Sequence, residues 1–555
     1  MSTYIVTSAP PNPNGDLHLG HLSGPFLGAD VLTRHLRQRG HHVRHVGYSD
    51  EHSCYVPRRA AEIGATAYET AFRFGNRMEE TLSLGAMHHD WFTRPLTNPR
   101  HTAVVQEFFT SLWEQDRLVV RNLPVFYCAG CERHLYEAEV RGECQFCGDP
   151  SDGVYCEACG LPQEPAGLAA PRCTSCWEEP EQRTLDRICF PLEDYRGQLL
   201  DYYERAQAQA EWRPRLTAYL ETLLSRELPL TPISRIADYG IPVPLDEWDG
   251  HILDTWFSGI FGYTAATACL TEAEGEPELW RRQWTDPETK IVNFIGFDCS
   301  FSHAVLWPAL LMAQGTLTLP SQIVTNEFYR LEGEKFSTSR NHAVWGGEFL
   351  RQVSADALRF HLCLTGPERE QTNFAAKEFA DTVETLLVDG LERWAESVLR
   401  LLGEDFGSTV PAVAAAQAYT GPLTEVLDGL ADEIASTLAA ESLSPQVAAT
   451  ALAHAIDRGV DDLPALARSR AAAEHSDDAK DAYARRLVTH VEALALVTSL
   501  SAPLMPGWSA FLAPHLGLEV SAVTRMPGWP DRTDGPLVAV GQEITAQPPT
   551  FFRQL

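Results

Sequence analysis

The chain has 555 residues, with 44 Lys and Arg against 75 Asp and Glu, which gives a net charge of −31 at pH 7. This balance argues against a broadly basic surface that coats nucleic acid, although a folded RNA can still be held by a few local basic groups. The length predicts three or four domains. Neither a run of roughly 18 apolar residues nor an N-terminal signal pattern occurs, so we expect a cytoplasmic protein without a membrane partner.

The first element is a predicted strand over Tyr4–Ser8, followed by a Pro/Asn/Gly loop and a helical pattern. Strand, loop and helix in this order are typical of the opening of a nucleotide-binding βα unit. The helix N-terminus offers free N–H groups and a positive dipole end to a phosphate. His18 and His21 lie three residues apart and can share one side of that turn, while Gly20 between them lets a nucleotide approach closely.

The pattern of alternating strands and helices continues beyond this unit. A second strand is predicted over His42–Tyr48, and it ends in a polar loop that contains Asp50. Helical patterns fill roughly Ala60–Gln115. The αβ pattern resumes around Ile241–Thr325, where the run Ile291–Ile295 is typical of a buried strand.

Eight of the 13 cysteines fall into four CxxC pairs within 49 residues. Each pair places two thiolates on one tight turn, and two such turns complete a tetrahedral shell of four sulfurs. In a cytosolic chain this pattern indicates structural zinc rather than disulfides. We expect one or two zinc ions, and spacing alone does not decide which pairs share an ion. The pairs are Cys128/Cys131, Cys144/Cys147, Cys156/Cys159 and Cys173/Cys176.

The second half of the chain holds a cationic loop and then long helices. The loop Lys335–Arg340 reads KFSTSR and lies after the second αβ segment; such a loop can close over a triphosphate and neutralise its charge. From about Phe374 the sequence becomes rich in Ala and Leu. Apolar residues with a 3.6-residue period over Thr382–Leu402 and Tyr483–Leu500 predict an α-helical bundle, and no structure is assigned after Pro530.

Residues 18–21 (HLGH) and 335–339 (KFSTS) resemble the two signature motifs of class I aminoacyl-tRNA synthetases. The finer match is to methionyl-tRNA synthetases and covers about Thr3 to Pro530. It runs through Asn14-Gly15, the four CxxC pairs, Ile233-Ser234-Arg235, Trp256, Gly262-Tyr263, Phe294–Asp298, His303 and Trp307-Pro308-Ala309.

This resemblance implies an α/β fold with a Rossmann-type parallel-sheet catalytic core, a zinc-knuckle insertion and an α-helical bundle. The implied domains are a first core half (1–115), an insertion (116–232), a second core half (233–325), a signature-loop and stem-contact region (326–373), a bundle of the anticodon-binding type (374–530) and a tail (531–555). It also favours a nested arrangement of the cysteines, with Cys144, Cys147, Cys156 and Cys159 on one zinc and the outer four on another.

The resemblance further implies that ATP, with Mg²⁺, and an amino acid (methionine first) form an aminoacyl-adenylate whose acyl group passes to tRNA. His18 and His21 would contact the phosphates, with Arg235 and Lys335 near the triphosphate. The implied ATP-binding residues are Gly20, Gly296, Asp298, Ser337, Thr338 and Ser339. The implied amino-acid-binding residues are Pro10, Asn12, Asp50, Trp256, Tyr263, Cys299, Ser302 and His303. Asp50 would pair with the substrate's α-ammonium.

The sequence departs from the family pattern at three places. Thr338 stands where the signature loop usually has a second lysine. Several positions of the amino-acid pocket are smaller or more polar than usual, namely Pro10, Asn12, Ile260, Cys299 and Ser302. An ungapped match puts Arg393 and Ser397 at the positions where the family has the Asn and Arg that read the methionine anticodon.

These departures leave three hypotheses. The first is a working methionine–tRNA ligase. The second is a paralogue that keeps adenylate chemistry but activates another amino acid, or passes it to an amine or thiol acceptor. The third is a non-catalytic protein that binds RNA or a protein partner. We expect a monomer.

Overall fold

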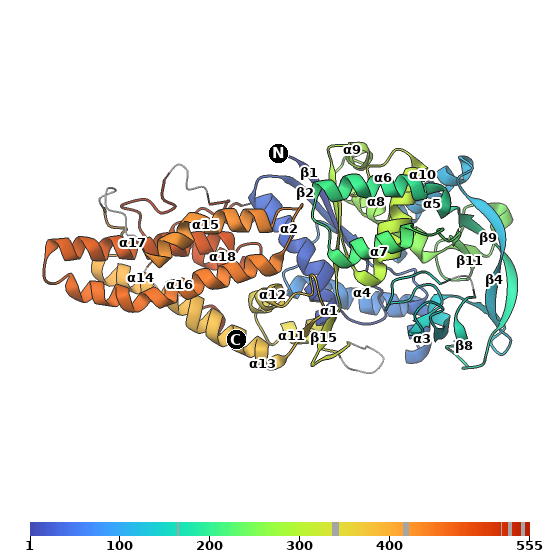
Figure 1. Ribbon diagram of the computed structural model, residues 1–555, viewed down its shortest axis with the longest axis horizontal. Coiled ribbons are helices and arrows are strands. Elements are labelled where there is room, and N and C mark those ends of the chain that lie inside the picture. Colours follow the sequence, from blue (N-terminus) through green and yellow to red (C-terminus); the bar gives the residue numbers. More distant parts are fainter. Residues whose placement is uncertain are drawn as a thin grey trace.

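The computed structural model describes residues 1–163, 166–335, 343–413, 421–522, 524–530, 535–545 and 550–554. The molecule is elongated, with an α/β core at one end and a helical bundle at the other (Figure 1). Among the described residues, none of the helices combines the length and the apolar character needed to cross a bilayer. The predicted fold class is confirmed, because a parallel sheet, an insertion with cysteine clusters and a C-terminal bundle are all present.

Five parallel strands form the central sheet, in the order β14-β13-β1-β2-β3. The first strand, β1, is in the middle. β2 and β3 follow it on one side, and β13 and β14, which come later in the sequence, lie on the other side. The carboxyl ends of β1 and β13 therefore flank a topological switch point, where open α/β sheets bind their ligands. The strands are β1 (Thr3–Ser8), β2 (His42–Tyr48), β3 (Trp91–Thr93), β13 (Lys290–Gly296) and β14 (Gln322–Asn326).

Helices cover both faces of this sheet, and their ends follow ordinary capping rules. A capping box between Thr66 and Glu69 starts α4, and Asn98 followed by a proline starts α5. The helices of the core are α1 (Leu19–His21), α2 (Leu27–Gln38), α3 (Tyr55–Ile63), α4 (Ala67–Leu84), α5 (Pro99–Glu114), α8 (Thr255–Ala273), α9 (Leu279–Thr285) and α10 (Trp307–Gln314). Two further segments, η1 (Leu22–Phe26) and η7 (Ser302–Leu306), have π-helical geometry, which is rare and often marks functional sites.

The insertion is built on a long antiparallel ribbon of β4 (Val119–Cys128) and β9 (Glu181–Phe190). The four CxxC turns follow at one end of this ribbon, with the short strands β5 (Arg133–Leu135), β6 (Val140–Glu143), β7 (Pro150–Asp152) and β8 (Ala169–Cys173). The chain then returns to the core through α6 (Arg196–Gln209), α7 (Pro214–Leu224), β10 (Thr231–Pro232), β11 (Ser234–Ile236) and β12 (His251–Leu253).

A small sheet and two helices join the core to the bundle. They are β15 (Tyr329–Leu331), β16 (Glu334–Lys335), β17 (Thr372–Phe374), α11 (Gly346–Leu350) and α12 (Ala355–Leu364). The bundle comprises α13 (Ala376–Asp381), η8 (Thr382–Glu392), α14 (Arg393–Phe406), α15 (Pro422–Thr437), α16 (Pro445–Ala472), α17 (Asp477–Leu500) and α18 (Pro506–Leu512). The tail, for which the sequence suggests no structure, packs on the bundle: Glu492 accepts the Val538 N–H at 2.8 Å, and the Phe552 ring stacks on Trp508.

Candidate active site

A cavity of about 350 Å³ opens at the carboxyl ends of β1 and β13. Its wall combines the loop after β1, the loop after β2, the start of α8, the loop after β13 and part of the cysteine-rich insertion. It includes nine residues that the sequence assigns to ATP or the amino acid: Pro10, Asn12, His18, His21, Asp50, Trp256, Asp298, Cys299 and His303. Five other predicted residues, Gly20, Arg235, Tyr263, Gly296 and Ser302, are not part of this lining.

The two signature histidines form one compact unit at the start of α1. Their rings stack with centroids 3.7 Å apart. Each Nδ1 accepts the backbone N–H of the other residue, at 3.2 and 3.3 Å. Both rings therefore carry their proton on Nε2, which is a donor that suits a phosphate oxygen. His21 touches solvent through the cavity but is surrounded by protein, and this desolvation lowers its pKa to about 4, so it is neutral at pH 7.

The segment after the second signature motif is bound to the first motif. Leu19 donates its N–H to the Val344 carbonyl at 3.1 Å, and Gly346 donates to the Leu17 carbonyl at 2.7 Å. The backbone of Lys335 ends the strand β16. Ser337, Thr338 and Ser339 lie outside the described residues, so the predicted contacts of this loop with ATP stay predictions.

In the loop after β13, the backbone of Gly296 packs closely against the carboxylate of Asp298. A Cβ added to Gly296 would lie 2.4 Å from Oδ1 of Asp298, so only glycine leaves this carboxylate in place. Asp298 lines the cavity, close to the end of β13, where a ribose bound at the switch point would lie. Its role toward ribose hydroxyls remains a prediction.

Acidic groups gather at the end of the cavity nearer the insertion. Burial raises the pKa of Asp50 well above its usual value, and the nearby Glu137 raises it further, while Arg235 opposes the shift. Arg235 itself is 2% exposed and donates to Thr255 Oγ1 at 3.2 Å. A carboxylate held in this surrounding is stabilised by any cation that enters the cavity, as the predicted ammonium-binding role of Asp50 requires.

The imidazole of His303 is held by three neighbours, namely the hydroxyls of Tyr263 and Ser302 and the Cys299 carbonyl. Tyr263 Oη lies 2.8 Å from Nε2, and Ser302 Oγ lies 2.8 Å from Nδ1. Because the Ser302 hydroxyl donates to the Cys299 carbonyl, Nδ1–H must donate to Ser302, and Nε2 then accepts from Tyr263. Burial lowers the pKa of His303 to about 4. Tyr263 and Ser302 therefore lie behind the wall and fix a neutral histidine in it.

Insertion residues of the cavity wall that were missed from the sequence include Glu137, Arg141, Asp152 and Tyr155. Asp152 accepts the Tyr55 hydroxyl at 2.8 Å, and Tyr155 meets the Trp256 ring edge-on at 4.4 Å. They occur between the CxxC pairs, where the sequence has little hydrophobic periodicity. No local signal distinguishes them from linker residues, because only the folding of the insertion onto α3 and α8 brings them to the cavity.

The eight cysteines of the CxxC pairs form two groups of four. Cys128, Cys131, Cys173 and Cys176 make one group, and Cys144, Cys147, Cys156 and Cys159 the other, with all sulfurs of a group within 4.8 Å of one another. This is the nested arrangement. Closest sulfur pairs are 3.4 to 3.8 Å apart, close to the edge of roughly 3.8 Å for a tetrahedron with Zn–S bonds of about 2.3 Å. Either group can hold a zinc ion.

Comparison with known proteins identifies the family. The family model "tRNA synthetases class I (M)" matches residues 4–399, and a methionine–tRNA ligase of Thermomicrobium roseum is 32% identical over 518 residues, 93% of this chain and 87% of that enzyme. The chain belongs to the class I (M) tRNA synthetases. A methionine–tRNA ligase of Chlorobaculum tepidum is 35% identical over 417 residues, and the chain matches 59% of that relative's length.

Solved structures of this class have the same fold. The methionyl-tRNA synthetase of Mycobacterium tuberculosis bound by methionyl-adenylate superposes with a TM-score of 0.78 at 20% identity, covering 99% of each chain. The free form of that enzyme superposes with a TM-score of 0.70 at 20% identity, covering 100% of this chain and 98% of the other. At this identity the likeness establishes the fold.

Proposed function

We propose that the protein activates methionine with ATP and transfers the methionyl group to tRNA. The observation that carries the proposal is one cavity of this class I (M) chain, whose wall contains both the paired donors of His18 and His21 and the carboxylate of Asp50. Phosphate and ammonium groups of the two substrates would thereby be bound in one space. Such positioning supplies much of the catalysis when the reaction needs little acid–base help.

In the proposed reaction a carboxylate oxygen of methionine attacks the α-phosphorus of ATP, and the bond from that phosphorus to the bridging oxygen breaks to release pyrophosphate. The Nε2–H groups of His18 and His21 donate to phosphate oxygens as charge builds on them. Asp50 binds the α-ammonium and orients the attacking carboxylate. Trp256 and the neutral His303 form an uncharged part of the wall, which suits a thioether rather than a charged side chain.

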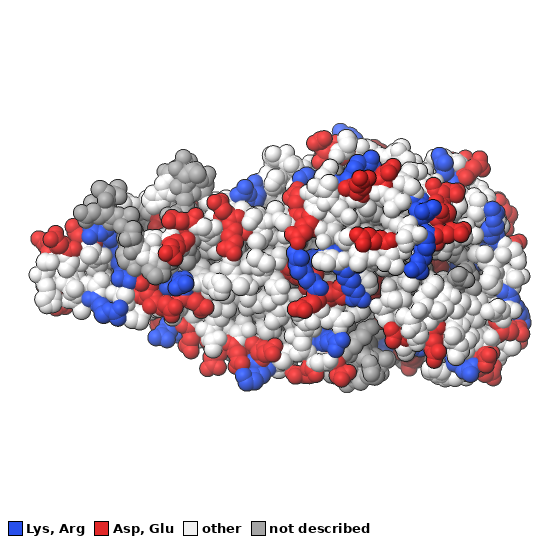
Figure 2. Space-filling model, viewed as in Figure 1, with Lys and Arg blue, Asp and Glu red and all other residues white. Residues whose placement is uncertain are grey.

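Transfer to tRNA is the second step of the proposal, supported by the relatives named methionine–tRNA ligase. Arg393 and Ser397 line an open groove in the bundle, at the place where the resemblance expects anticodon contacts. Lys and Arg are interspersed with Asp and Glu on the face in Figure 2, so RNA would be held by local basic groups rather than by a continuous basic surface. One chain supplies the whole cavity wall, and we propose a cytoplasmic monomer.

A second candidate keeps the adenylate chemistry but changes the amino acid. Asn12 Oδ1 is enclosed and has no hydrogen-bond partner in the described part of the chain. An orphaned acceptor of this kind favours a substrate that brings an N–H or O–H to it, whereas methionine's side chain has no such donor.

Pyrophosphate exchange into ATP with each amino acid separately distinguishes these functions, followed by acylation of total tRNA. Strong exchange with methionine and charging of tRNA support the first. Stronger exchange with a polar amino acid supports the second. The absence of exchange with every amino acid would contradict both and leave a protein that binds RNA or a partner without catalysis.

A further inference from the structure

Glu137 brings a carboxylate from the zinc-knuckle insertion into the wall of the amino-acid cavity. It opens the single-turn helix η3 (Glu137–Glu139) and is 6% exposed. Its Oε1 accepts the indole N–H of Trp256 at 2.9 Å, and its Oε2 accepts the Cys54 thiol at 3.0 Å. These donors belong to two separate core elements, so the carboxylate is fixed in orientation.

The turn that carries Glu137 is itself held from two sides. Thr174, inside the outer knuckle, donates its backbone N–H to the Glu139 carbonyl at 2.9 Å and its hydroxyl to the Ala138 carbonyl at 3.0 Å. Arg58 of α3 donates to the same Ala138 carbonyl at 3.0 Å. Glu137 is also one of the few non-glycine residues in the left-handed backbone region, with φ of +41°, a conformation that persists only where the surroundings impose it.

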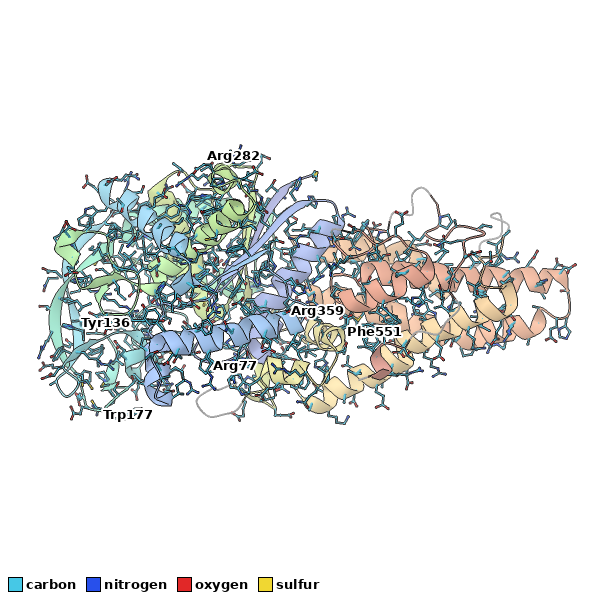
Figure 3. All side chains as sticks on the ribbon, turned by 180° about the vertical axis from the view of Figure 1, so that it is seen from behind. Arg77, Tyr136, Trp177, Arg282, Arg359 and Phe551 are labelled. Carbon is cyan, nitrogen blue, oxygen red and sulfur yellow. The ribbon has the colours of Figure 1, made fainter. Side chains whose placement is uncertain are left out.

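The insertion contacts the Trp256 indole at a second point. The ring of Tyr155, next to the inner knuckle, meets it edge-on at 4.4 Å. The backbone of Trp256 is fixed by the Asp254 cap of α8. The indole is therefore one place where the insertion and the amino-acid cavity meet. In Figure 3 Trp177 lies at the lower edge of the insertion, and Tyr136, which precedes Glu137, lies above it.

We propose that Glu137 is a positioning residue for amino-acid activation, which holds the Trp256 indole in the cavity wall and adds negative charge beside Asp50, where the substrate's α-ammonium binds. This inference rests on the proposed function. It makes the insertion part of the amino-acid site, in addition to carrying the two cysteine groups. A loosened Trp256 then weakens amino-acid binding more than it slows chemistry on the bound substrate.

Charges around Glu137 make this role depend on pH. Burial raises the pKa of Glu137 to about 7, Asp254 raises it as well, and Arg235 offsets these only in part. The groups that face Glu137 are Cys54, Tyr55, Asp50, Arg235, Asp254, Tyr155 and Cys299. Because a bound ammonium favours the ionised form, amino-acid binding is strongest where Glu137 is ionised, above about pH 7.

The test measures KM and kcat for methionine by pyrophosphate exchange in three variants. Glu137→Ala removes the acceptor, and we expect KM for methionine to rise about ten- to hundredfold with a smaller change in kcat and in KM for ATP. Glu137→Gln keeps an acceptor for the indole and should recover part of that loss at pH 8. Glu139→Gln is the matched control on the same turn, because its side chain caps Tyr136 N–H and does not line the cavity.

A double-mutant cycle and a pH series separate positioning from general damage. If Glu137 acts through the indole, adding Glu137→Ala to Trp256→Phe changes KM by much less than Glu137→Ala does alone. Wild-type KM for methionine should rise as the pH falls from 8 to 6. In Glu137→Gln that rise should move to lower pH, since the pKa of Asp50, raised first by burial, loses the contribution of Glu137.

The role of Glu137 is overturned if the wild type catalyses exchange and Glu137→Ala leaves KM for methionine unchanged. It is also overturned if the effects of the two substitutions in the cycle multiply. Either result leaves the proposed function standing. Absence of exchange by the wild type with every amino acid overturns both. Melting temperatures of all variants identify any loss that comes from unfolding, and Glu137→Gln, which is isosteric, still decides the pH dependence.

Discussion

Gly346 donates its backbone N–H to the carbonyl oxygen of Leu17 at 2.7 Å, so the segment that leaves the KFSTS loop is tied to the residue just before the HLGH motif. Contact at this point is close. A Cβ at Gly346 would lie 2.8 Å from both Leu22 Cδ1 and Thr81 Cγ2, and 3.0 Å from the Leu17 oxygen. The segments around Leu17 and Gly346, more than 300 residues apart in sequence, therefore share one packed joint.

Gly346→Ala should disturb this joint. Overpacking of this kind costs about 1–3 kcal/mol, so we expect a lower melting temperature and a KM for ATP that rises several-fold in pyrophosphate exchange. Gly197→Ala is the matched control, because that glycine is in the helix α6 with no atom within 4 Å of the added Cβ. The control should be neutral or slightly stabilising. Equal behaviour of the two variants would contradict the role of the joint.

A buried ion pair connects the core to the bundle. Arg359 of α12 is fully buried, pairs with Asp30 of α2 at 2.7 Å and donates to the Pro503 and Leu504 carbonyls at 2.8 and 2.9 Å. Figure 3 shows Arg359 where the core meets the bundle. Arg359→Met should lower the free energy of unfolding by about 3–5 kcal/mol, because it leaves a buried carboxylate with less compensation. Adding Asp30→Asn should recover part of this loss, as urea unfolding at pH 7 would reveal.

The same pair predicts loss of stability in acid. Burial alone would raise the pKa of Asp30, but the guanidinium groups of Arg34 and Arg359 outweigh it and hold the pKa far below its usual range. A depressed folded-state pKa contributes stability above the unfolded value of about 3.9 that is lost as the pH falls through that value and below. Wild-type unfolding free energy should therefore drop between pH 5 and pH 3. In Asp30→Asn the drop should be shallower, and an identical slope would refute the assignment.

The core was predictable from sequence because its signals are local. The strand predicted over His42–Tyr48 has those bounds in the structure, and the apolar run Ile291–Ile295 lies within β13. Both are parallel strands of the central sheet, and the buried part of each contains β-branched residues. The helix predicted from Tyr483 begins six residues earlier, at Asp477, because Ser476 caps it. A polar cap and first turn carry no apolar periodicity.

The insertion and parts of the site were not predictable in this way. The strand β4 is exposed or half-exposed over most of its length, so it shows no regular alternation of apolar residues. Glu137 is fixed at the cavity by contacts with Cys54 and Trp256, which lie 83 and 119 residues away in sequence. Arg235 is part of the family motif Ile233-Ser234-Arg235, yet it lies behind the cavity lining, against Thr255. The motif does not indicate how deeply this side chain is buried.

Two cysteine groups predict two zinc ions per chain. Elemental analysis of the purified protein should give a zinc content of about two, and a chelator that removes zinc should lower the melting temperature, because the insertion has a small apolar core of its own. Cys147→Ser should reduce the content to about one, since it removes a ligand from the inner group only. Cys189→Ser, at a buried cysteine outside both groups, is the control and should retain two.

Ser302 lets us test whether the unusual pocket is tuned for methionine. Its hydroxyl receives the Nδ1–H of His303 at 2.8 Å, and Ser302→Ala removes that acceptor while leaving the longer contact, 3.3 Å, to the Cys299 carbonyl. A lost hydrogen bond of this kind is worth about 1 kcal/mol, so KM for methionine should rise roughly fivefold with little change in KM for ATP. Ser300→Ala, at a buried serine bonded to the Phe297 carbonyl, is the matched control.

Because burial holds the pKa of His303 near 4, the Ser302→Ala effect on KM for methionine should be constant between pH 6 and pH 8. An effect that grows toward pH 6 would mean that His303 takes up a proton there, and the neutral histidine in the cavity wall would have to be abandoned.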